Sequence, residues 1–384
     1  MNEKRRWVGL TAAIATLVLA LGLAACGGDD DGVGGAGDRE VPVAQGGEAT
    51  GDVLISNWPG YIDKGSGNTL DEFEQETGVQ VDYKEDINDN VVFFNKLKPQ
   101  LDQGNAGGRS LAVVTDWMAK RMYDLGYLEE FNQDDLPTVF DNILPQFEES
   151  TSDPDRKFSI PWQGGQTGVW VDTNQAPEID EVKDLFDPKY QGKVTMLTEM
   201  RDTVPLVLQS EGIDPDEATK EDWLAAIDML REARDSGQIR RFTGNEYTED
   251  LTAGNIVAAI GWSGDQSLIG REGVEWRRPT DGCDVFFDQM VIPIGAPNTA
   301  AALEFMNFTY RPEVAADITS YVQYVTPVSG VQEVLAQSEP KVANDPKIFP
   351  TEEEIAPCSE DPNPPGSAED QAEVEAAFQE VVSG

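Results

Sequence analysis

The sequence predicts an α/β protein with two lobes, each built on a mixed, mainly parallel sheet that is flanked by helices. Three observations support this fold class. Strand-like and helix-like segments alternate from residue 52 onward, the strand-like segments are short and apolar, and several helix-like segments end at a glycine. Alternating strands and helices favour a parallel sheet with helices on its faces. Because the alternation occurs in two sets, we expect two lobes within the 384 residues.

The first set contains three strands, each followed by a helix. Apolar or alternating runs predict the strands at residues 52–58, 79–83 and 111–115. Helical spacing predicts the helices at residues 68–78, 91–101 and 117–126. The first helix has Asn68 or Thr69 as its N-cap and ends at Gly78. Pro99 is expected to bend or interrupt the second.

The second set repeats this alternation and then becomes mainly helical. Strands are expected at residues 167–172, 192–197, 256–262 and 286–293. Helices are expected at residues 203–212, 220–237, 301–309, 312–324 and 370–382. The helix at 220–237 has its N-cap near Thr219, and residues 359–368 form a Pro-rich loop.

The N-terminus has the pattern of an export signal. Three basic residues, Lys4 to Arg6, precede an apolar stretch that ends in Leu-Ala-Ala-Cys at Cys26. This ending resembles the bacterial lipobox, which implies cleavage after residue 25 and a lipid on Cys26; a single transmembrane anchor is the alternative. Residues 26–51 are rich in Gly and acidic residues and predict a flexible tether. We therefore expect an exported protein that is lipid-anchored to the outer face of the cytoplasmic membrane.

Composition excludes several classes of function. The formal net charge of -43 repels nucleic acid and anionic lipid and favours cationic partners, although a solvated acidic surface explains most of it. The absence of histidine excludes Ser-His-Asp and Cys-His catalysis and most zinc enzymes. No metal site, cofactor or nucleic-acid partner is expected. In an oxidising compartment Cys283 and Cys358 are expected to form a disulfide, with two free thiols as the alternative.

Polar and aromatic residues follow four of the expected strands and lie in the middle of a fifth, and ligands of open α/β sheets bind outside the carboxyl ends of strands. The motifs there are NWPGY at 57–61, TDWMAKRM at 115–122, EMRD at 199–202, GWSGD at 261–265 and FFDQMVIP at 286–293. Together with YVQYVTP at 321–327 and the run 158–172, they resemble the spermidine/putrescine-binding proteins of bacterial ABC importers, which are type II periplasmic binding proteins. The similarity covers residues 52–355.

The resemblance implies that the chain crosses between the lobes twice and binds its ligand in the cleft between them. Lobe 1 would comprise residues 52–162 and 287–332, and lobe 2 would comprise residues 163–286 and 333–384. It further implies a binding protein without enzymatic activity, expected to be a monomer. This protein would capture a polyamine and present it to a membrane permease that is driven by a cytoplasmic ATPase.

The resemblance also assigns roles to residues. Asp265 and Asp202, and less directly Glu199, would hold one ammonium group, and Asp288 would hold the other. Thr115 would offer a hydroxyl group. Aromatic rings would line the methylene chain, at Trp58, Tyr61, Trp117, Trp262, Phe286 and Tyr324. Aromatic rings and carboxylates suit a diamine, because the rings attract cations as well as methylene groups.

Each assignment has a structural alternative. The tryptophans are also typical core residues, Asp265 is also a turn residue, and Asp202 is also a helix cap. The family often has a hydroxyl and an acid where this chain has Pro59 and Gly60, so Asp116 or the loop 85–90 would have to compensate.

Two other classes of function remain open. A binding protein of the same fold for ferric iron, a sugar or another cation is the nearest alternative. A secreted glycoside hydrolase with paired carboxylates is a further one.

Overall fold

The computed structural model describes residues 41–384. The expected signal sequence, the lipid site at Cys26 and residues 26–40 of the expected tether lie outside the described residues. Within them, no helix combines the length and the apolar character that crossing a membrane requires.

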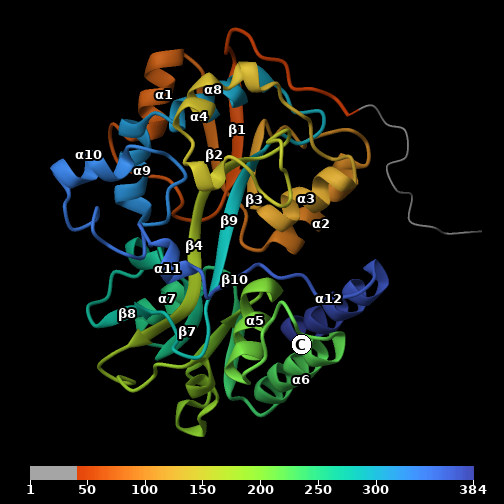
Figure 1. Ribbon diagram of the computed structural model, residues 1–384, viewed down its shortest axis with the longest axis vertical. Helices are drawn as coiled ribbons and strands as arrows, with labels where there is room; N and C mark the ends of the chain where they lie inside the picture. The colour runs from red at the N-terminus through yellow and green to blue at the C-terminus, as the bar shows by residue number, and fades with distance from the viewer. Residues whose placement is uncertain (1–40) are drawn as a thin grey trace, which may run out of the picture.

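One mixed sheet runs through both lobes (Figure 1). Its strands lie in the order β2-β1-β3-β9-β4-β7-β5-β6, with β10 beside β9 and β8 beside β4. In chain order the strands are β1 (Asp52–Asn57), β2 (Gln80–Glu85), β3 (Leu111–Thr115), β4 (Ile160–Asp172), β5 (Val194–Leu197), β6 (Ile239–Thr243), β7 (Ala258–Trp262), β8 (Val274–Arg277), β9 (Asp284–Val291) and β10 (Ser359–Glu360). The predicted strands are therefore present, with shifted ends.

Two long antiparallel strands join the lobes. The first lobe contains β1 with β2 and β3 parallel on either side of it, and the second contains β5 parallel to β6 and β7. Between them, β9 is antiparallel to β3 and β4 is antiparallel to β7 and β9. Because β4 and β9 extend from one lobe into the other, they are the connections about which the lobes can move (Figure 1). The two-lobed α/β fold agrees with the sequence analysis.

Helices cover the sheet in both lobes (Figure 1). Those of the first lobe are α1 (Thr69–Thr77), α2 (Asn90–Leu101), α3 (Asp116–Asp124), α4 (Pro137–Asn142), α8 (Thr299–Thr309), α9 (Pro312–Val322) and α10 (Val331–Ser338). Those of the second lobe are α5 (Met200–Ser210), α6 (Lys220–Asp235), α7 (Tyr247–Ala253) and α12 (Ala368–Ser383), and α11 (Glu352–Ile355) lies in the late loop. Helix α10 packs on α9, so residues 333–338 lie with the first lobe although the sequence placed them in the second.

Local sequence explains where several helices begin and end. The Asn68 side chain accepts a hydrogen bond from Asp71 N, which identifies the N-cap of α1, and Gly78 ends the helix with a φ of 76°. Thr219 and Asp222 form a reciprocal capping box at the start of α6. Pro99 does not end α2, which continues to Leu101.

The predicted Cys283–Cys358 disulfide is present, with the two Cα atoms 4.7 Å apart. It joins the residue before β9 to the residue before β10, so it holds the late loop against a strand that connects the lobes. The loop it closes spans a sequence separation of 75 residues.

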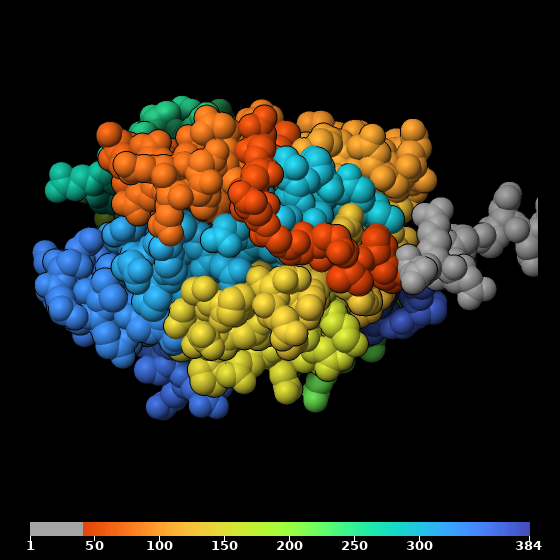
Figure 2. Space-filling model, turned by 90° about the horizontal axis from the view of Figure 1, so that it is seen from above, coloured from red at the N-terminus to blue at the C-terminus, as the bar shows by residue number. Residues whose placement is uncertain are grey.

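The described part of the expected tether lies on the first lobe. Ala44 is buried, and its backbone N–H donates to Glu130 O at 2.6 Å. Gln45 exchanges two hydrogen bonds of 3.1 Å with the Thr299 hydroxyl. The segment crosses the surface of this lobe in Figure 2. The prediction of a flexible tether is therefore wrong for residues 42–46, because their backbone groups find partners on the lobe.

Candidate functional site

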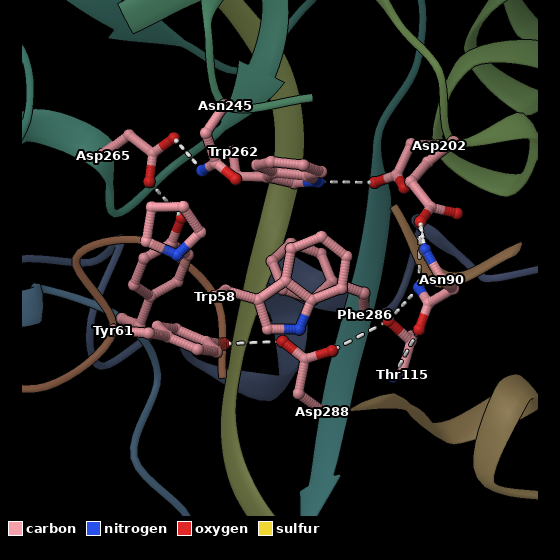
Figure 3. A pocket seen from close by; sticks show the side chains of 13 residues that line it. Trp58, Tyr61, Asn90, Thr115, Asp202, Asn245, Trp262, Asp265, Phe286 and Asp288 are labelled. Atoms are coloured by element: carbon pink, nitrogen blue, oxygen red, sulfur yellow. Dashed lines mark hydrogen bonds between the residues drawn. The ribbon is translucent and has the colours of Figure 1, made fainter. Parts of the chain in front are cut away.

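A cavity lies between the lobes, where strands from both halves of the sheet end. Its free volume is small, about 30 Å³, which is about the volume that one water molecule occupies in the liquid. It is lined by Trp58, Pro59, Tyr61, Asn90, Thr115, Glu199, Asp202, Asn245, Trp262, Asp265, Phe286, Asp288 and Tyr324. Most of these side chains come from the ends of β1, β3, β5 and β7 and from the middle of β9. Asn90 begins α2, Asn245 follows β6, and Tyr324 follows α9. Figure 3 shows most of them converging on one space.

Five aromatic rings form the walls of the cavity. The Trp58 and Trp262 rings meet edge to face, with their centroids 5.7 Å apart, and Tyr61 and Tyr324 do so at 4.9 Å. Phe286 lies between the pairs, 6.4 Å from Trp262 and 6.2 Å from Tyr324. Trp58 follows β1 of the first lobe and Trp262 ends β7 of the second, so this pair forms only when the lobes are close together.

Asp265 occupies one end of the cavity. Its carboxylate accepts hydrogen bonds from the hydroxyls of Tyr247 and of Tyr324, the latter at 2.7 Å, and from Asn245 Nδ2 at 3.4 Å. Burial raises the pKa of Asp265 to about 6, although these hydrogen bonds favour the charged form. The side chain is held in place by neutral donors alone.

Asp288 projects from β9 toward the opposite wall. Its two oxygens accept hydrogen bonds of 2.8 Å from the hydroxyls of Tyr61 and Thr115 (Figure 3). Burial raises the pKa of Asp288 to about 7, and the negative charge of Asp202 contributes to the increase.

Two more carboxylates lie at the start of α5. Asp202 accepts hydrogen bonds from the Thr167 hydroxyl and from Trp262 Nε1, the latter at 2.9 Å, and burial raises its pKa to about 6. Glu199 accepts hydrogen bonds from the backbone N–H of Asn90 at 2.5 Å and from its Nδ2 at 3.0 Å. Because Asn90 belongs to the first lobe, Glu199 joins the two lobes at the edge of the cavity. Burial raises the pKa of Glu199 well above its ordinary value.

The charge of the cavity is not balanced by protein side chains. Four carboxylates line it, and none of the lining residues is Lys or Arg. A buried carboxylate without a cation is costly in free energy, which is why burial is the first cause of each raised pKa. Among the described residues no group of His, Cys, Asp and Glu has the arrangement of a metal site. The cavity therefore suits an organic cation with an apolar body.

Ten of the eleven residues predicted for the site line this cavity, and Trp117 does not. Trp117 is the second residue of α3, and the Arg201 guanidinium lies 3.8 Å from the centre of its ring. The prediction is wrong because a helix begins directly after Thr115. Thr115 ends β3 and faces the cavity, whereas Trp117 lies in the first turn of α3, where the two-residue alternation of a strand no longer applies, and its ring lies against Arg201.

The expected grouping of the carboxylates also needs correction. Asp202 and Asp265 lie on opposite sides of the Trp262 ring and share none of their hydrogen-bond donors (Figure 3). They therefore do not form one end of the cavity together. Asp202 lies instead at the start of α5, bonded to Trp262 Nε1, and its charge contributes to the raised pKa of Asp288.

Three residues near the site were not assigned from the sequence. Asn90 links Thr115 and Glu199, Asn245 donates to Asp265, and Tyr247 donates to Asp265 while accepting from Trp262 N at 2.9 Å. Asn90 is the last residue of the loop 85–90 that was expected to compensate for Pro59 and Gly60, and Asp116 does not line the cavity. Asn245 follows β6, so extending the strand-end argument to β6 identifies it.

Gly60 stands at a position where the resembling family often has a polar residue, and packing against the second lobe favours glycine there. Its φ is 69°, and a Cβ there would lie 2.7 Å from Leu268 Cδ2 of the second lobe. A side chain at this position would require the Leu268 side chain to shift and would hold the backbone in a left-handed conformation that favours glycine.

Comparison with known proteins identifies the family to which the chain belongs. Residues 68–351 match the family described as bacterial extracellular solute-binding protein. A spermidine/putrescine-binding periplasmic protein of Escherichia coli is 25% identical over 348 residues, which cover 89% of this chain and 90% of that protein. A putrescine-binding periplasmic protein of Pseudomonas aeruginosa is 28% identical over 323 residues, covering 78% of this chain and 83% of its own.

A solved structure agrees with the fold as well. The putative spermidine/putrescine ABC transporter from Listeria monocytogenes superimposes with a TM-score of 0.74 at 26% identity. The superposition covers 86% of this chain and 98% of that one.

Proposed function

Because this chain belongs to the bacterial extracellular solute-binding proteins, we propose that it captures a polyamine, putrescine or spermidine, in the cleft between its lobes. It then delivers the polyamine to the permease of an ABC importer. This role is one of binding and transport, without turnover of the ligand. Relatives that are named for putrescine and spermidine binding support the choice of ligand class.

The observation behind this proposal is a cavity with four carboxylates, five aromatic rings and no basic side chain. A diamine supplies two positive charges at the ends of an apolar chain. Its ammonium groups replace the missing counter-ions, and aromatic faces attract both the charges and the methylene groups. An uncharged sugar would leave the carboxylates without a counter-ion, and ferric iron would not use the rings.

We assign one ammonium group to Asp265 and the other to Asp288 with Asp202 beside it. Tyr247, Tyr324 and Asn245 orient Asp265, and Tyr61 and Thr115 orient Asp288. Trp262 and Trp58 flank the carbon chain between these ends. Glu199 contributes negative potential and joins the lobes through Asn90.

The partners and the location follow from the same role. The protein acts outside the cytoplasm as a monomer, and a lipid on Cys26 holds it at the outer face of the cytoplasmic membrane. The cytoplasmic ATPase of the importer drives uptake through the permease. A Cys26→Ala variant is expected to lose membrane association.

Calorimetric titration of the purified protein tests the ligand class. Putrescine and spermidine are expected to bind with micromolar or lower Kd, equivalent to about -8 kcal/mol or better. Glucose, maltose and ferric citrate are the competing ligands. Binding of a sugar or of iron without amine binding would contradict the proposal, and so would hydrolysis of a glycoside.

A further inference from the structure

A second contact between the lobes lies outside the cavity, on the side of α3 and α12. It contains Trp117, which the sequence analysis had placed against the ligand. Four residues take part: Trp117 and Arg121 on α3 of the first lobe, and Arg201 on α5 and Glu375 on α12 of the second lobe.

Arg201 is the centre of this contact. Its guanidinium stacks over the Trp117 ring at 3.8 Å from the centroid and pairs with Glu375 at 3.0 Å. It also donates two hydrogen bonds, of 3.1 and 2.9 Å, to Asn363 Oδ1. The Arg201 side chain is only 5% exposed, so these partners replace most of its contact with water.

Glu375 forms a second connection from the second lobe to the first. One of its oxygens pairs with Arg201, and the other pairs with Arg121 at 3.1 Å. The chain of interactions therefore starts at Trp117 on α3, passes through α5 and α12, and ends at Arg121 on α3. Each of its two connections between lobes forms only when α3 lies close to α5 and α12.

The contact is linked to the cavity through the first turn of α5. Arg201 lies between Glu199 and Asp202 in the sequence, and both of those carboxylates line the cavity. On the cavity side, Glu199 is bound to Asn90 of the first lobe, at 2.5 and 3.0 Å. The start of α5 is thus attached to the first lobe on two sides, and a shift of Arg201 shifts both carboxylates.

We propose that Trp117, Arg121, Arg201 and Glu375 form an interlobe latch, in which Arg201 acts as a positioning residue that sets how long a bound ligand stays in the cleft. The proposal rests on the proposed function for the identity of the ligand. The latch stabilises the closed arrangement of the lobes without touching the ligand. Ligand release requires the lobes to separate, so loss of the latch increases the rate of release. Ligand entry occurs in the open arrangement, where the latch is absent, so the association rate rises only in proportion to the open fraction of the free protein.

Removing part of the latch gives a defined kinetic pattern. Glu375→Gln and Arg121→Gln each weaken the link to α3, and Trp117→Leu removes the stacked ring. Each variant is expected to release putrescine about three- to tenfold faster, in line with one stacking or ion-pair interaction. Arg201→Lys keeps a charge for Glu375 but loses the planar stack, so its release rate is expected to lie between those of wild type and Trp117→Leu.

The same helix supplies a matched control. Glu373 lies two residues before Glu375 and pairs with Lys220 at the start of α6, so this ion pair stays within the second lobe. Glu373→Gln is therefore expected to leave the release rate at the wild-type value. Stopped-flow displacement of bound putrescine, followed by tryptophan fluorescence, compares Glu375→Gln with Glu373→Gln directly.

A second readout judges the latch without any ligand. Spin labels on ketone-bearing residues that replace the exposed Lys96 of α2 and Ala225 of α6 report the distance between the lobes. Wild type and Glu373→Gln are expected to show the same closed fraction, and Glu375→Gln and Arg121→Gln a smaller one. If the wild-type protein does not bind putrescine, the proposed function is contradicted. The distance between the spin labels still tests the latch, because it is measured without ligand. Equal distance distributions in all four proteins would overturn the latch, as would equal release rates in Glu375→Gln and Glu373→Gln.

Discussion

The buried carboxylates of the cavity lower the free energy of unfolding of the unliganded protein. Asp288 is 4% exposed, and its hydrogen-bond partners are neutral hydroxyl groups. Its pKa of about 7 in the folded chain, against an ordinary value of 3.8, means that ionisation opposes folding at neutral pH. The site is complementary to a cationic ligand. In the unliganded protein the negative charge of the site has no counter-ion.

Asp288→Asn is expected to stabilise the unliganded protein at pH 8. The variant removes a buried negative charge, and the loss of one accepted hydrogen bond offsets part of the gain, which leaves about 1–3 kcal/mol. The gain is expected to vanish near pH 4, where Asp288 of the wild type is protonated in the folded state. Urea unfolding of both proteins at pH 8 and pH 4 measures the difference. Equal stability of the two proteins at both pH values would contradict the account of the buried charge.

Trp262→Leu is expected to weaken putrescine binding by about 1 kcal/mol, because leucine fills much of the space but has no aromatic face. Trp223 is a matched control, since it is fully buried in α6 of the second lobe and does not line the cavity. Trp223→Leu is expected to lower the unfolding temperature and leave the affinity unchanged. Calorimetric titration of the folded variants compares the two tryptophans, and equal losses of affinity would show that Trp262 acts only through stability.

At the scale of elements, the sequence predicted where strands end. It did not predict which side chains of a helix face the cavity. Short apolar runs locate β1, β3, β7 and β9. The site residues follow β1, β3 and β7, whereas those of β9 lie in its middle, where Asp288 is opposite Thr115 of antiparallel β3. Trp117 was misplaced because its direction depends on the residue at which α3 begins. Asn90 was identified only as part of a loop, because its contact with Glu199 requires the second lobe to lie against the first.

The disulfide holds β10 against β9 and is expected to stabilise the protein through the long loop that it closes. In the loop-entropy model a loop of this length contributes roughly 4 kcal/mol. Replacing Cys283 and Cys358 together by serine is expected to lower the unfolding temperature and to increase amide exchange in residues 356–363. Mass spectrometry of the alkylated, non-reduced protein checks the bond itself, and two alkylated thiols would contradict it.

At the scale of the whole molecule, the sequence predicted the two-lobed architecture. It did not predict which lobe some peripheral segments pack against. Alternating strands and helices predicted both lobes, and the family pattern predicted the cleft. Residues 42–46 and 333–338 were misplaced because their positions depend on surfaces of the first lobe that only the folded chain creates. Low apolar content in the segment before β1 indicated a tether, but backbone hydrogen bonds, the burial of Ala44 and the contact of Gln45 with Thr299 hold part of it in place.

Binding and folding are expected to respond to pH in opposite directions. The pKa values of Asp202, Asp265 and Asp288 lie at about 6, 6 and 7, above the ordinary 3.8. The unliganded folded state therefore binds more protons than the unfolded state between pH 4 and pH 7, so its stability rises as pH falls through this window. A diamine requires the charged carboxylates, so its affinity is expected to fall from pH 8 to pH 5.

Proton release measures this coupling. At pH 6.5 putrescine binding is expected to release protons, because the ligand lowers the pKa of the carboxyl groups that it contacts. Titrations in two buffers with different ionisation enthalpies give the number of protons released. A value of zero, together with an affinity that does not change between pH 8 and pH 5, would contradict the role of these carboxylates.

The central claim is that the cleft recognises a dication through carboxylates at two separate ends. Calorimetric titration of wild type, Asp265→Asn and Asp288→Asn with putrescine and with 1-aminobutane tests it most directly. Removal of a carboxylate from a buried ammonium costs about 2–5 kcal/mol, so each variant is expected to bind putrescine at least tenfold more weakly. Wild type is expected to bind 1-aminobutane far more weakly than putrescine, and only the variant at the occupied end is expected to reduce that binding further. If both folded variants bind putrescine as tightly as wild type, Asp265 and Asp288 do not hold the ligand.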